Sequence, residues 1–364
     1  MKKVITQYIK VDRQNPAPEA LRAAGAILAR GGLVAFPTET VYGLGANALD
    51  GAAVKRIYEA KGRPSDNPMI IHVAALDQVE ELVTSVPEAA RALMRIFWPG
   101  PLTLVLPVDP GVPREVTAGL GSVAVRMPGH RVALALIEAA GTPLAAPSAN
   151  LSGRPSPTTA AHVLRDLNGR IDMILDGGPA GVGVESTVLD LTGPVPVILR
   201  PGGVTLEALQ EILGEVRVDP AVLNRSPGDN PARPRSPGMK YTHYAPQAPL
   251  FLFKGAKEKV AEKIKELALA YQVEHKRVGI LAYRDSEDYT GYGQVVLAGQ
   301  REKPETVAAG LYAALRRFDE LEVDVILAEG IQEKGVGFAV MNRLRRAADG
   351  RITDVAGSGP GAGS

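Results

Sequence analysis

The sequence contains no cysteine, and this absence removes several kinds of chemistry at once. Disulfide bonds, thiol nucleophiles and cysteine-ligated zinc sites are all excluded. The absence fits a reducing compartment, and a cytoplasmic location is expected. No apolar run approaches the roughly 20 residues that a membrane-spanning helix needs, so no membrane association is expected. The N-terminus carries two lysines but lacks the apolar segment of a secretion signal.

The chain also lacks an excess of charge of either sign, and it has few aromatic residues. It carries 41 Lys and Arg against 40 Asp and Glu, and aromatic residues make up 5%. A balanced chain has no long-range field to draw it onto nucleic acid, so phosphate binding must depend on local clusters. The sequence G-x-x-x-x-G-K-[ST] is absent, which excludes a P-loop NTPase. The five histidines are not closely paired, which argues against a histidine metal site.

Glycine and proline, in contrast, are plentiful. The 39 glycines and 29 prolines predict many tight turns and short elements. Up to about residue 215, short apolar strands alternate irregularly with amphipathic helices, which predicts an α/β domain with a twisted mixed sheet. The expected helices are 18–30, 51–60, 76–84, 88–97, 130–140, one capped by Thr158 that ends at Leu167, and one capped by Thr205.

Residues 216–249 differ from both flanking parts because they are rich in proline and poor in apolar periodicity. They are expected to form a linker or lid between a catalytic domain, 1–215, and a smaller C-terminal α/β domain, 250–356. Strand and helix patterns alternate again in this smaller domain, which predicts a Rossmann-like arrangement, with a long helix over 304–320. The residues 357–364 are expected to be a flexible tail.

Lys61 and Arg63 lie one residue apart at the end of a predicted helix, directly before Pro64. Lysine supplies a compact charge and arginine a bidentate fork, a combination that suits a polyphosphate. The alternative is two solvated cations that stabilise the C-terminus of the helix, and the segment alone favours that alternative. Because both residues lie in a polar segment, removing either is expected to cost little stability.

Ser148 and Asn150 follow the apolar strand 143–147, at the strand end where ligand crevices form in α/β sheets. Turn chemistry explains them equally well, because Ser and Asn side chains also bond to their own backbone. Ser148 does not lie in a G-x-S-x-G sequence, so a nucleophilic role is not expected. His72 alternates with apolar neighbours in 69–73, which leaves open a site residue or a buried, hydrogen-bonded histidine.

Arg200 ends the strand 195–200 and is followed by Gly202 and Gly203. The glycines permit close approach of the backbone to a ligand, and the arginine could reach a phosphate group, although ordinary hairpin turns explain the glycines equally well. Residues 43–48, GLGANA, within the segment 38–48, TETVYGLGANA, loosely match a dinucleotide-binding fingerprint. We expect it to be a polar loop with no helix beginning inside it, so a nicotinamide site is not expected.

Taken in order, these segments resemble the threonylcarbamoyl-AMP synthase family, whose fold is called YrdC-like. The resemblance covers roughly residues 10–246, and the chain beyond is similar to longer members with an additional C-terminal domain. It implies that L-threonine, bicarbonate and ATP give threonylcarbamoyl-AMP and pyrophosphate, for the modification t6A at position 37 of tRNA by downstream transferase machinery. The similar segments are 36–48, 61–68, 72–73, 98–106, 116–119, 123–128, 143–158, 184–191, 198–203 and 236–246.

The resemblance also implies roles for single residues. Arg126 would pair with the threonine carboxylate, Lys61 and Arg63 would be catalytic, and Mg²⁺ would accompany ATP without a metal site in the protein itself. The positions that match threonine contacts are Thr40, His72, Arg126, Ala146 and Ser186. The positions that match ATP contacts are Arg63, Asn67, Ser122, Ser148, Asn150, Ser156, Arg200, Tyr241 and Tyr244.

Two other functions remain as alternatives. One is a regulatory protein that binds double-stranded RNA or tRNA; the balanced charge and the few aromatic residues weigh against it, although a weak tRNA contact is compatible with a synthase. The other is carbamoyl transfer in hydrogenase maturation, by proteins with a similar domain. Those proteins carry cysteine zinc motifs, and this chain has no cysteine.

Overall fold

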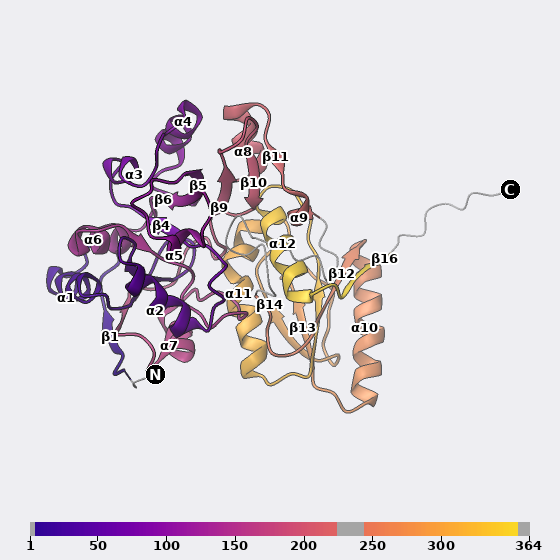
Figure 1. Cartoon of the computed structure of the whole chain (residues 1–364). Coiled ribbons are helices and arrows are strands. Elements are labelled where there is room, and N and C mark those ends of the chain that lie inside the picture. Colours follow the sequence, from indigo (N-terminus) through magenta and orange to yellow (C-terminus); the bar gives the residue numbers. More distant parts are fainter. Residues whose placement is uncertain (1–3, 224–243, 356–364) are drawn as a thin grey trace. The chain divides into compact units, whose positions relative to one another are not determined.

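The computed structural model describes residues 4–223 and 244–355 (Figure 1). Within these ranges the chain folds as two compact units. The first comprises 4–152 and 156–223, and the second comprises 153–155 and 244–355. The tail predicted at 357–364 and most of the predicted linker, with Tyr241, lie outside the described residues.

The first unit is built on an 11-stranded mixed sheet, as the sequence predicts. Its strands are β1 (Gln7–Lys10), β2 (Val34–Phe36), β3 (Gly43–Asn47), β4 (Ile70–His72), β5 (Leu102–Pro107), β6 (Ser122–Arg126), β7 (Leu144–Ala145), β8 (Met173–Asp176), β9 (Thr187–Asp190), β10 (Val197–Arg200) and β11 (Arg217–Val218). They lie in the order β1-β8-β2-β3-β7-β4-β6-β5-β9-β10-β11. At its centre β4 runs parallel to β6, and β5 runs antiparallel to β6 and parallel to β9.

Most helices of this unit follow the predicted amphipathic segments, but the helix predicted over 76–84 spans only Asp77–Glu80, and the short helices Arg114–Thr117 and Pro220–Leu223 were not predicted. They are α1 (Pro18–Ala29), α2 (Gly51–Lys61), α3 (Asp77–Glu80), α4 (Glu88–Phe97), α5 (Arg114–Thr117), α6 (Arg131–Ala140), α7 (Ala160–Leu167), α8 (Leu206–Leu213) and α9 (Pro220–Leu223). No helix in the described part of the chain is both long enough and apolar enough to cross a membrane.

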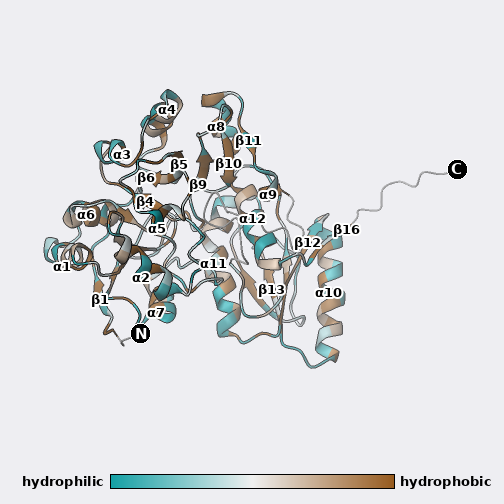
Figure 2. Ribbon diagram, in the orientation of Figure 1, coloured by the Kyte–Doolittle hydropathy of each residue, from teal (hydrophilic) through white to brown (hydrophobic). Residues whose placement is uncertain are grey.

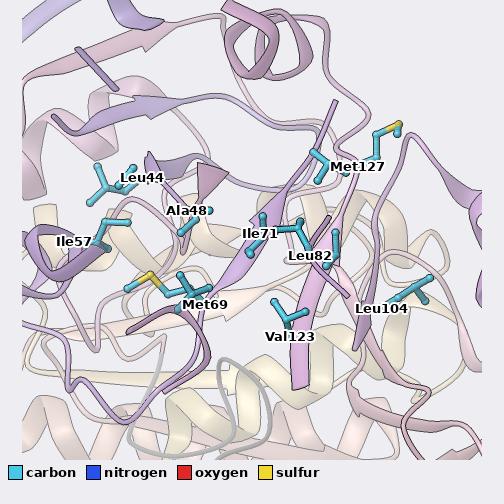
Figure 3. Close-up of a cluster of buried hydrophobic side chains, with 14 of the residues drawn as sticks. Leu44, Ala48, Ile57, Met69, Ile71, Leu82, Leu104, Val123 and Met127 are labelled. Carbon is cyan, nitrogen blue, oxygen red and sulfur yellow. The ribbon is translucent and has the colours of Figure 1, made fainter. Parts of the chain in front are cut away.

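The two faces of the sheet are covered differently. Helices α2, α4, α7 and α8 contribute buried side chains to a main core on one face. Leu44, Ile71 and Val123 of three different strands belong to this core together with Ile57 of α2 (Figure 3). On the other face α1 and α6 cover a second core with β2, β7 and β8. The main core therefore fixes the orientation of the central strands, whose alternate side chains must emerge on the opposite face.

Two further local predictions in this unit are wrong. Residues 43–47, predicted as part of a polar loop, form β3, which pairs with β2 and β7. A Cβ atom at Gly45 would lie 2.9 Å from the ring of Phe36, so its glycine serves close packing between strands rather than a turn. Helix α7 is capped by Thr159, which accepts from the N–H of His162 at 3.3 Å, and not by Thr158. Thr158 instead contacts the His162 ring.

The second unit is a parallel five-stranded sheet with helices on both faces. Its elements are β12 (Leu250–Gly255), α10 (Lys257–Val273), β13 (Val278–Ala282), β14 (Gln294–Leu297), α11 (Pro304–Glu320), β15 (Val325–Glu329), α12 (Val336–Ala348) and β16 (Ile352–Val355). The strand order is β14-β13-β15-β12-β16. Helix α10 covers one face, and the ring of Phe318 of α11 packs on Gly279 from the other. Figure 2 shows α10 with both hydrophilic and hydrophobic residues along its length, as a surface helix requires.

Candidate active site

The central strands carry polar side chains on the face opposite the main core. Strand register pairs His72 of β4 with Arg126 of β6, so both side chains leave the same face. Ser122 lies on that face too, about 13 Å along β6 from Arg126. Between these positions five side chains form an apolar floor: Ile70, Val105, Ala124, Val188 and Leu199. The strands thus present an apolar surface edged by polar and cationic groups.

Arg126 is buried and held on three sides. Its Nε donates to the carbonyl oxygen of Gly100 at 3.1 Å, and its Nη1 donates to Oγ1 of Thr40 at 2.9 Å. Its Nη2 lies 2.6 Å from Oε1 of Glu39. Oγ1 of Thr40 is in turn 2.8 Å from Oγ1 of Thr38. The guanidinium group therefore has a fixed orientation, which a bidentate contact with a carboxylate requires.

His72 is buried next to this guanidinium group. Its Nδ1 lies 3.3 Å from the carbonyl oxygen of Ile70. Burial first, and then the charges of Arg126 and Arg200, lower the pKa of His72 to about 3. The imidazole is consequently neutral near pH 7, where one ring nitrogen donates a hydrogen bond and the other accepts one.

Ser186 and Arg200 form a second polar group. The Nε of Arg200 donates to the carbonyl oxygen of Ser186 and its Nη2 to the Ser186 Oγ, both at 3.1 Å. That Oγ also lies 2.7 Å from Oγ1 of Thr103. A Cβ atom at Gly202 would lie 2.3 Å from the carbonyl oxygen of Glu185, so glycine is needed where two backbone segments meet. This approach of backbone to backbone, rather than to a ligand, accounts for Gly202.

Lys61 ends α2, which Gly62 closes in the left-handed conformation. Its side chain is buried, and Nζ donates to the carbonyl oxygens of Ser148 at 2.5 Å and Asn150 at 2.6 Å. Oγ of Ser148 donates to Oδ1 of Asn150 at 2.6 Å, so the three residues form one unit. The prediction that Lys61 lies in a polar segment at little cost in burial is therefore wrong. The lysine holds the loop that carries Ser148 and Asn150.

Arg63 and Asn67 lie together after α2. The Nη2 of Arg63 donates to the carbonyl oxygens of Asn67 at 3.3 Å and Pro68 at 3.0 Å. The hydroxyl group of Tyr58 reaches the carbonyl oxygens of Asn67 at 3.1 Å and Glu115 at 2.8 Å. The side-chain amide of Asn67 is fully buried and has no hydrogen-bond partner among the described residues. Because an unpaired buried amide is costly, this group points to a bound ligand.

Ser156, Ala146 and Ser122 are the remaining predicted residues of the first unit. Oγ of the buried Ser156 donates to Oε1 of Glu185 at 2.5 Å. The N–H of Ala146 donates to the carbonyl oxygen of Ile70 at 2.9 Å, which joins the segment after β7 to β4. Ser122 is half-buried at the start of β6. Their roles as ATP or threonine contacts stay predictions.

Tyr244 belongs to the second unit. Its ring lies 5.4 Å from that of Tyr312, and the guanidinium group of Arg343 lies 5.3 Å from its centre. The ring is buried in these contacts. The contact with ATP predicted for Tyr241 and Tyr244 stays a prediction, and Tyr241 lies outside the described residues.

Comparison with known proteins bears on both units. Residues 26–202 match a family model described as "Telomere recombination", and residues 204–349 match "Threonylcarbamoyl-AMP synthase, C-terminal domain". The threonylcarbamoyl-AMP synthase of Pyrococcus abyssi is 52% identical over 337 residues, which cover 92% of this chain and 96% of the relative. The Bacillus subtilis protein of that name is 54% identical over 336 residues, with coverages of 92% and 94%. The chain belongs to the threonylcarbamoyl-AMP synthase family.

A solved structure extends the likeness to the fold of the threonylcarbamoyl-AMP synthase family. The crystal structure of P. abyssi Sua5 complexed with L-threonine matches with a TM-score of 0.91 at 52% identity, and covers 96% of this chain and 100% of that chain. The resemblance stated from the sequence is thereby confirmed, and so is the fold class, for both units.

Membership of the family does not by itself identify every residue that shapes the site, and sequence reasoning missed four. Each contacts a predicted residue: they are Thr38, Glu39, Thr103 and Glu185. A signal existed for all four, since they lie in the similar segments 36–48, 98–106 and 184–191, and Glu39 also stands between two threonines. Over 4–223 and 244–355, no three His, Asp or Glu side chains gather in a way that could hold a metal ion.

Proposed function

We propose that this chain is a threonylcarbamoyl-AMP synthase, which converts L-threonine, bicarbonate and ATP to threonylcarbamoyl-AMP and pyrophosphate. One observation carries the proposal. Arg126, Thr40 and His72 share a buried face in a chain 52% identical to a protein solved with L-threonine bound. A fixed guanidinium group suits the carboxylate of an amino acid, and hydroxyl and neutral imidazole groups suit its side-chain hydroxyl. Because AMP is transferred to a carbamate, the enzyme would be a nucleotidyltransferase.

The proposed reaction has two steps. The threonine amine and bicarbonate first form a carbamate, and a carbamate oxygen then attacks the α-phosphorus of ATP as pyrophosphate leaves. Transfer at phosphorus depends on positioning and on neutralising charge, and needs no nucleophile from the enzyme. Arg63 and Arg200 would offset the charge of the phosphates. Lys61 would place its charge under the loop of Ser148 and Asn150 and keep that loop in position.

ATP would enter as its Mg²⁺ complex, so the metal would be part of the substrate and would offset charge on the phosphates. The buried amide of Asn67, with Ser122 and Ser156, would contact the nucleotide. The product would pass to the transferase machinery that makes t6A on tRNA. A direct weak contact with tRNA and a cytoplasmic location remain predictions.

The test is a direct assay of the purified chain with ATP, Mg²⁺, bicarbonate and L-threonine. Mass spectrometry should detect threonylcarbamoyl-AMP, and release of pyrophosphate should require both threonine and bicarbonate. Equal release with either one omitted would contradict the proposal. A strongly salt-dependent affinity for RNA without ATP turnover would instead favour the RNA-binding alternative.

A further inference from the structure

The carboxylate of Glu39 is buried beside Arg126 and has unused capacity for hydrogen bonds. Its Oε1 lies 2.6 Å from Nη2 of Arg126, and the two side chains are 13% and 4% exposed. At this distance the two groups form an ion pair, and Oε2 of the carboxylate has no hydrogen-bond partner within the described residues. One oxygen of the buried carboxylate is thus left without a partner beside a buried cation.

The position of Glu39 is fixed by its backbone. Its carbonyl oxygen accepts from the N–H groups of Gly181 at 3.0 Å and Val182 at 2.7 Å. Its carboxyl carbon lies 3.4 Å from the place where a Cβ atom of Gly129 would stand, so a larger residue at 129 would crowd the carboxylate. Such anchoring distinguishes Glu39 from a surface glutamate that meets a cation by chance.

The charged and titratable groups around Glu39 are few. Arg126 of β6 faces the carboxylate directly. His130, the N-cap of α6, interacts with Glu39, but burial and then Arg13 lower the pKa of His130 to about 4. His130 is therefore neutral at pH 7, and arginines keep their charge far above it. The environment of the carboxylate does not change its charge between pH 7 and 9.

A free L-amino acid carries the complementary pair of charges, a carboxylate and an ammonium group on one carbon atom. Arg126 suits the carboxylate, and an ammonium group placed beside it without a counter-charge would be costly to bury. We propose that Glu39 binds the α-ammonium group of L-threonine and accepts its proton when the amine reacts with bicarbonate. This inference rests on the proposed function and assigns a further catalytic residue to it.

The proposed step is balanced in atoms and charge. One proton passes from the ammonium group to the Glu39 carboxylate, which frees the nitrogen lone pair. The nitrogen then forms a bond to the bicarbonate carbon, a C–O bond breaks, and water leaves with the second amine hydrogen, giving the carbamate. Glu39 returns its proton to solvent, so the sum is threonine and bicarbonate to carbamate, water and one proton.

Binding provides the first test. Calorimetry should compare L-threonine with 2,3-dihydroxybutanoate of the same configuration, in which a hydroxyl group replaces the ammonium group. The wild-type chain should prefer L-threonine by roughly 30-fold or more, the range for losing one partner of a buried charge pair. Glu39→Gln should remove most of this preference, and Glu39→Asp should keep part of it. The control Glu19→Gln, at a side chain 76% exposed, should behave as wild type.

The pH dependence of turnover provides the second test. Pyrophosphate release by Glu39→Gln should be depressed at pH 7 and should recover as pH rises, by at most about tenfold per pH unit and levelling off once the pKa of the amine is passed, because it follows the fraction of free amine. The rate of pyrophosphate release by the wild-type chain should change much less between pH 7 and pH 9. A role confined to holding Arg126 in place would lower threonine affinity without this alkaline recovery.

The outcomes separate this inference from the proposed function. If wild type binds both ligands equally, or if Glu39→Gln keeps both the preference and the wild-type pH profile, the assignment of Glu39 is wrong even when threonylcarbamoyl-AMP is formed. If no threonylcarbamoyl-AMP is formed but the ammonium preference depends on Glu39, the proposed function fails and the ammonium contact stands.

Discussion

His72 and Arg126 are register partners on neighbouring parallel strands, so a neutral imidazole and a permanent cation share one buried face. The guanidinium charge opposes protonation of the imidazole, and burial opposes it further. The face consequently keeps a single cation at this point throughout the neutral range. Recognition of a carboxylate there should not depend on the titration of His72.

The second buried histidine predicts how stability responds to acid. Burial and Arg13 lower the pKa of His130 from 6.5 to about 4, so between these values the unfolded chain binds a proton that the folded chain does not. The contribution of His130 to the free energy of unfolding is therefore fully present above pH 6.5 and is lost as the pH falls toward 4. The variant His130→Asn keeps an acceptor for the N–H of Val132. Between pH 7 and pH 5 its free energy of unfolding should decrease by about 1 kcal/mol less than that of wild type, allowing for solvent screening.

Urea unfolding at pH 7, 6 and 5 measures this difference. The control is His275→Asn, at an exposed histidine in the left-handed conformation that asparagine tolerates. The free energy of unfolding of this variant should change with pH in the same way as that of wild type. The same pH dependence for His130→Asn as well would show that His130 is not a source of the acid sensitivity.

Lys61→Met tests the buried lysine under the loop of Ser148 and Asn150. Two carbonyl oxygens would lose their donor, which costs about 1–3 kcal/mol, and ATP-dependent turnover should fall at least tenfold. Lys55→Met on the same helix removes an exposed lysine paired with Glu115 at 3.1 Å, and should change stability by less than about 1 kcal/mol. Urea midpoints and pyrophosphate release measure both effects. Equal stability of the two variants would contradict the structural role.

Tyr58→Phe tests the hydrogen bond from the Tyr58 hydroxyl group that holds the backbone of Asn67. Burial raises the pKa of Tyr58 to about 12, so the hydroxyl group stays a donor at every assay pH. Its loss should cost about 1 kcal/mol and raise the KM for ATP several-fold, with the KM for threonine little changed. Tyr8→Phe, which removes an exposed hydroxyl bonded to Asp176 at 2.6 Å, serves as the control. A rise in both KM values would show a general disturbance of the site instead.

Glu329→Gln tests a buried ionic cluster in the second unit. Glu329 pairs with Arg301 and accepts from Ser286 at 2.6 Å and Tyr289 at 2.5 Å, and its side chain is 1% exposed. Removing its charge leaves Arg301 without its buried partner and should destabilise the unit by about 2–4 kcal/mol. Hydrogen exchange of the full chain should show this loss in β13 and β15. Glu322→Gln, in an exposed pair with Arg277, should not show it.

The sequence predicted the long helices well and three exposed edge strands poorly. Helix α11 spans 304–320 as expected, because its apolar period repeats over several turns. The strands β1, β11 and β16 were not expected, because they are largely exposed edge strands that lack the continuous apolar run by which β2, β4 and β7 were predicted. Each forms by pairing with a strand that local sequence does not reveal: β8, β10 and β12 respectively.

For the site, the residue types were more predictable than their partners. Arg126 and Thr40 are 86 positions apart, and their bond depends on how β6 and the segment before β3 fold together. The contact of Glu39 with Arg126 arises in the same way. Lys61 shows the converse error, because a polar neighbourhood in sequence became a buried one in space. Such pairings follow from tertiary packing, which no local pattern encodes.

Strand β6 supplies both the core and the site from alternate positions. Val123 and Val125 enter the main core, whereas Ser122, Ala124 and Arg126 face the other way. Inserting or deleting one residue in β6 would move side chains from one face of the sheet to the other, and would place Arg126 in the main core. A chain with that slip would lose its native core together with its site, so it could not persist as a folded but inactive species. Binding of threonine would therefore indicate that β6 has folded in its native register.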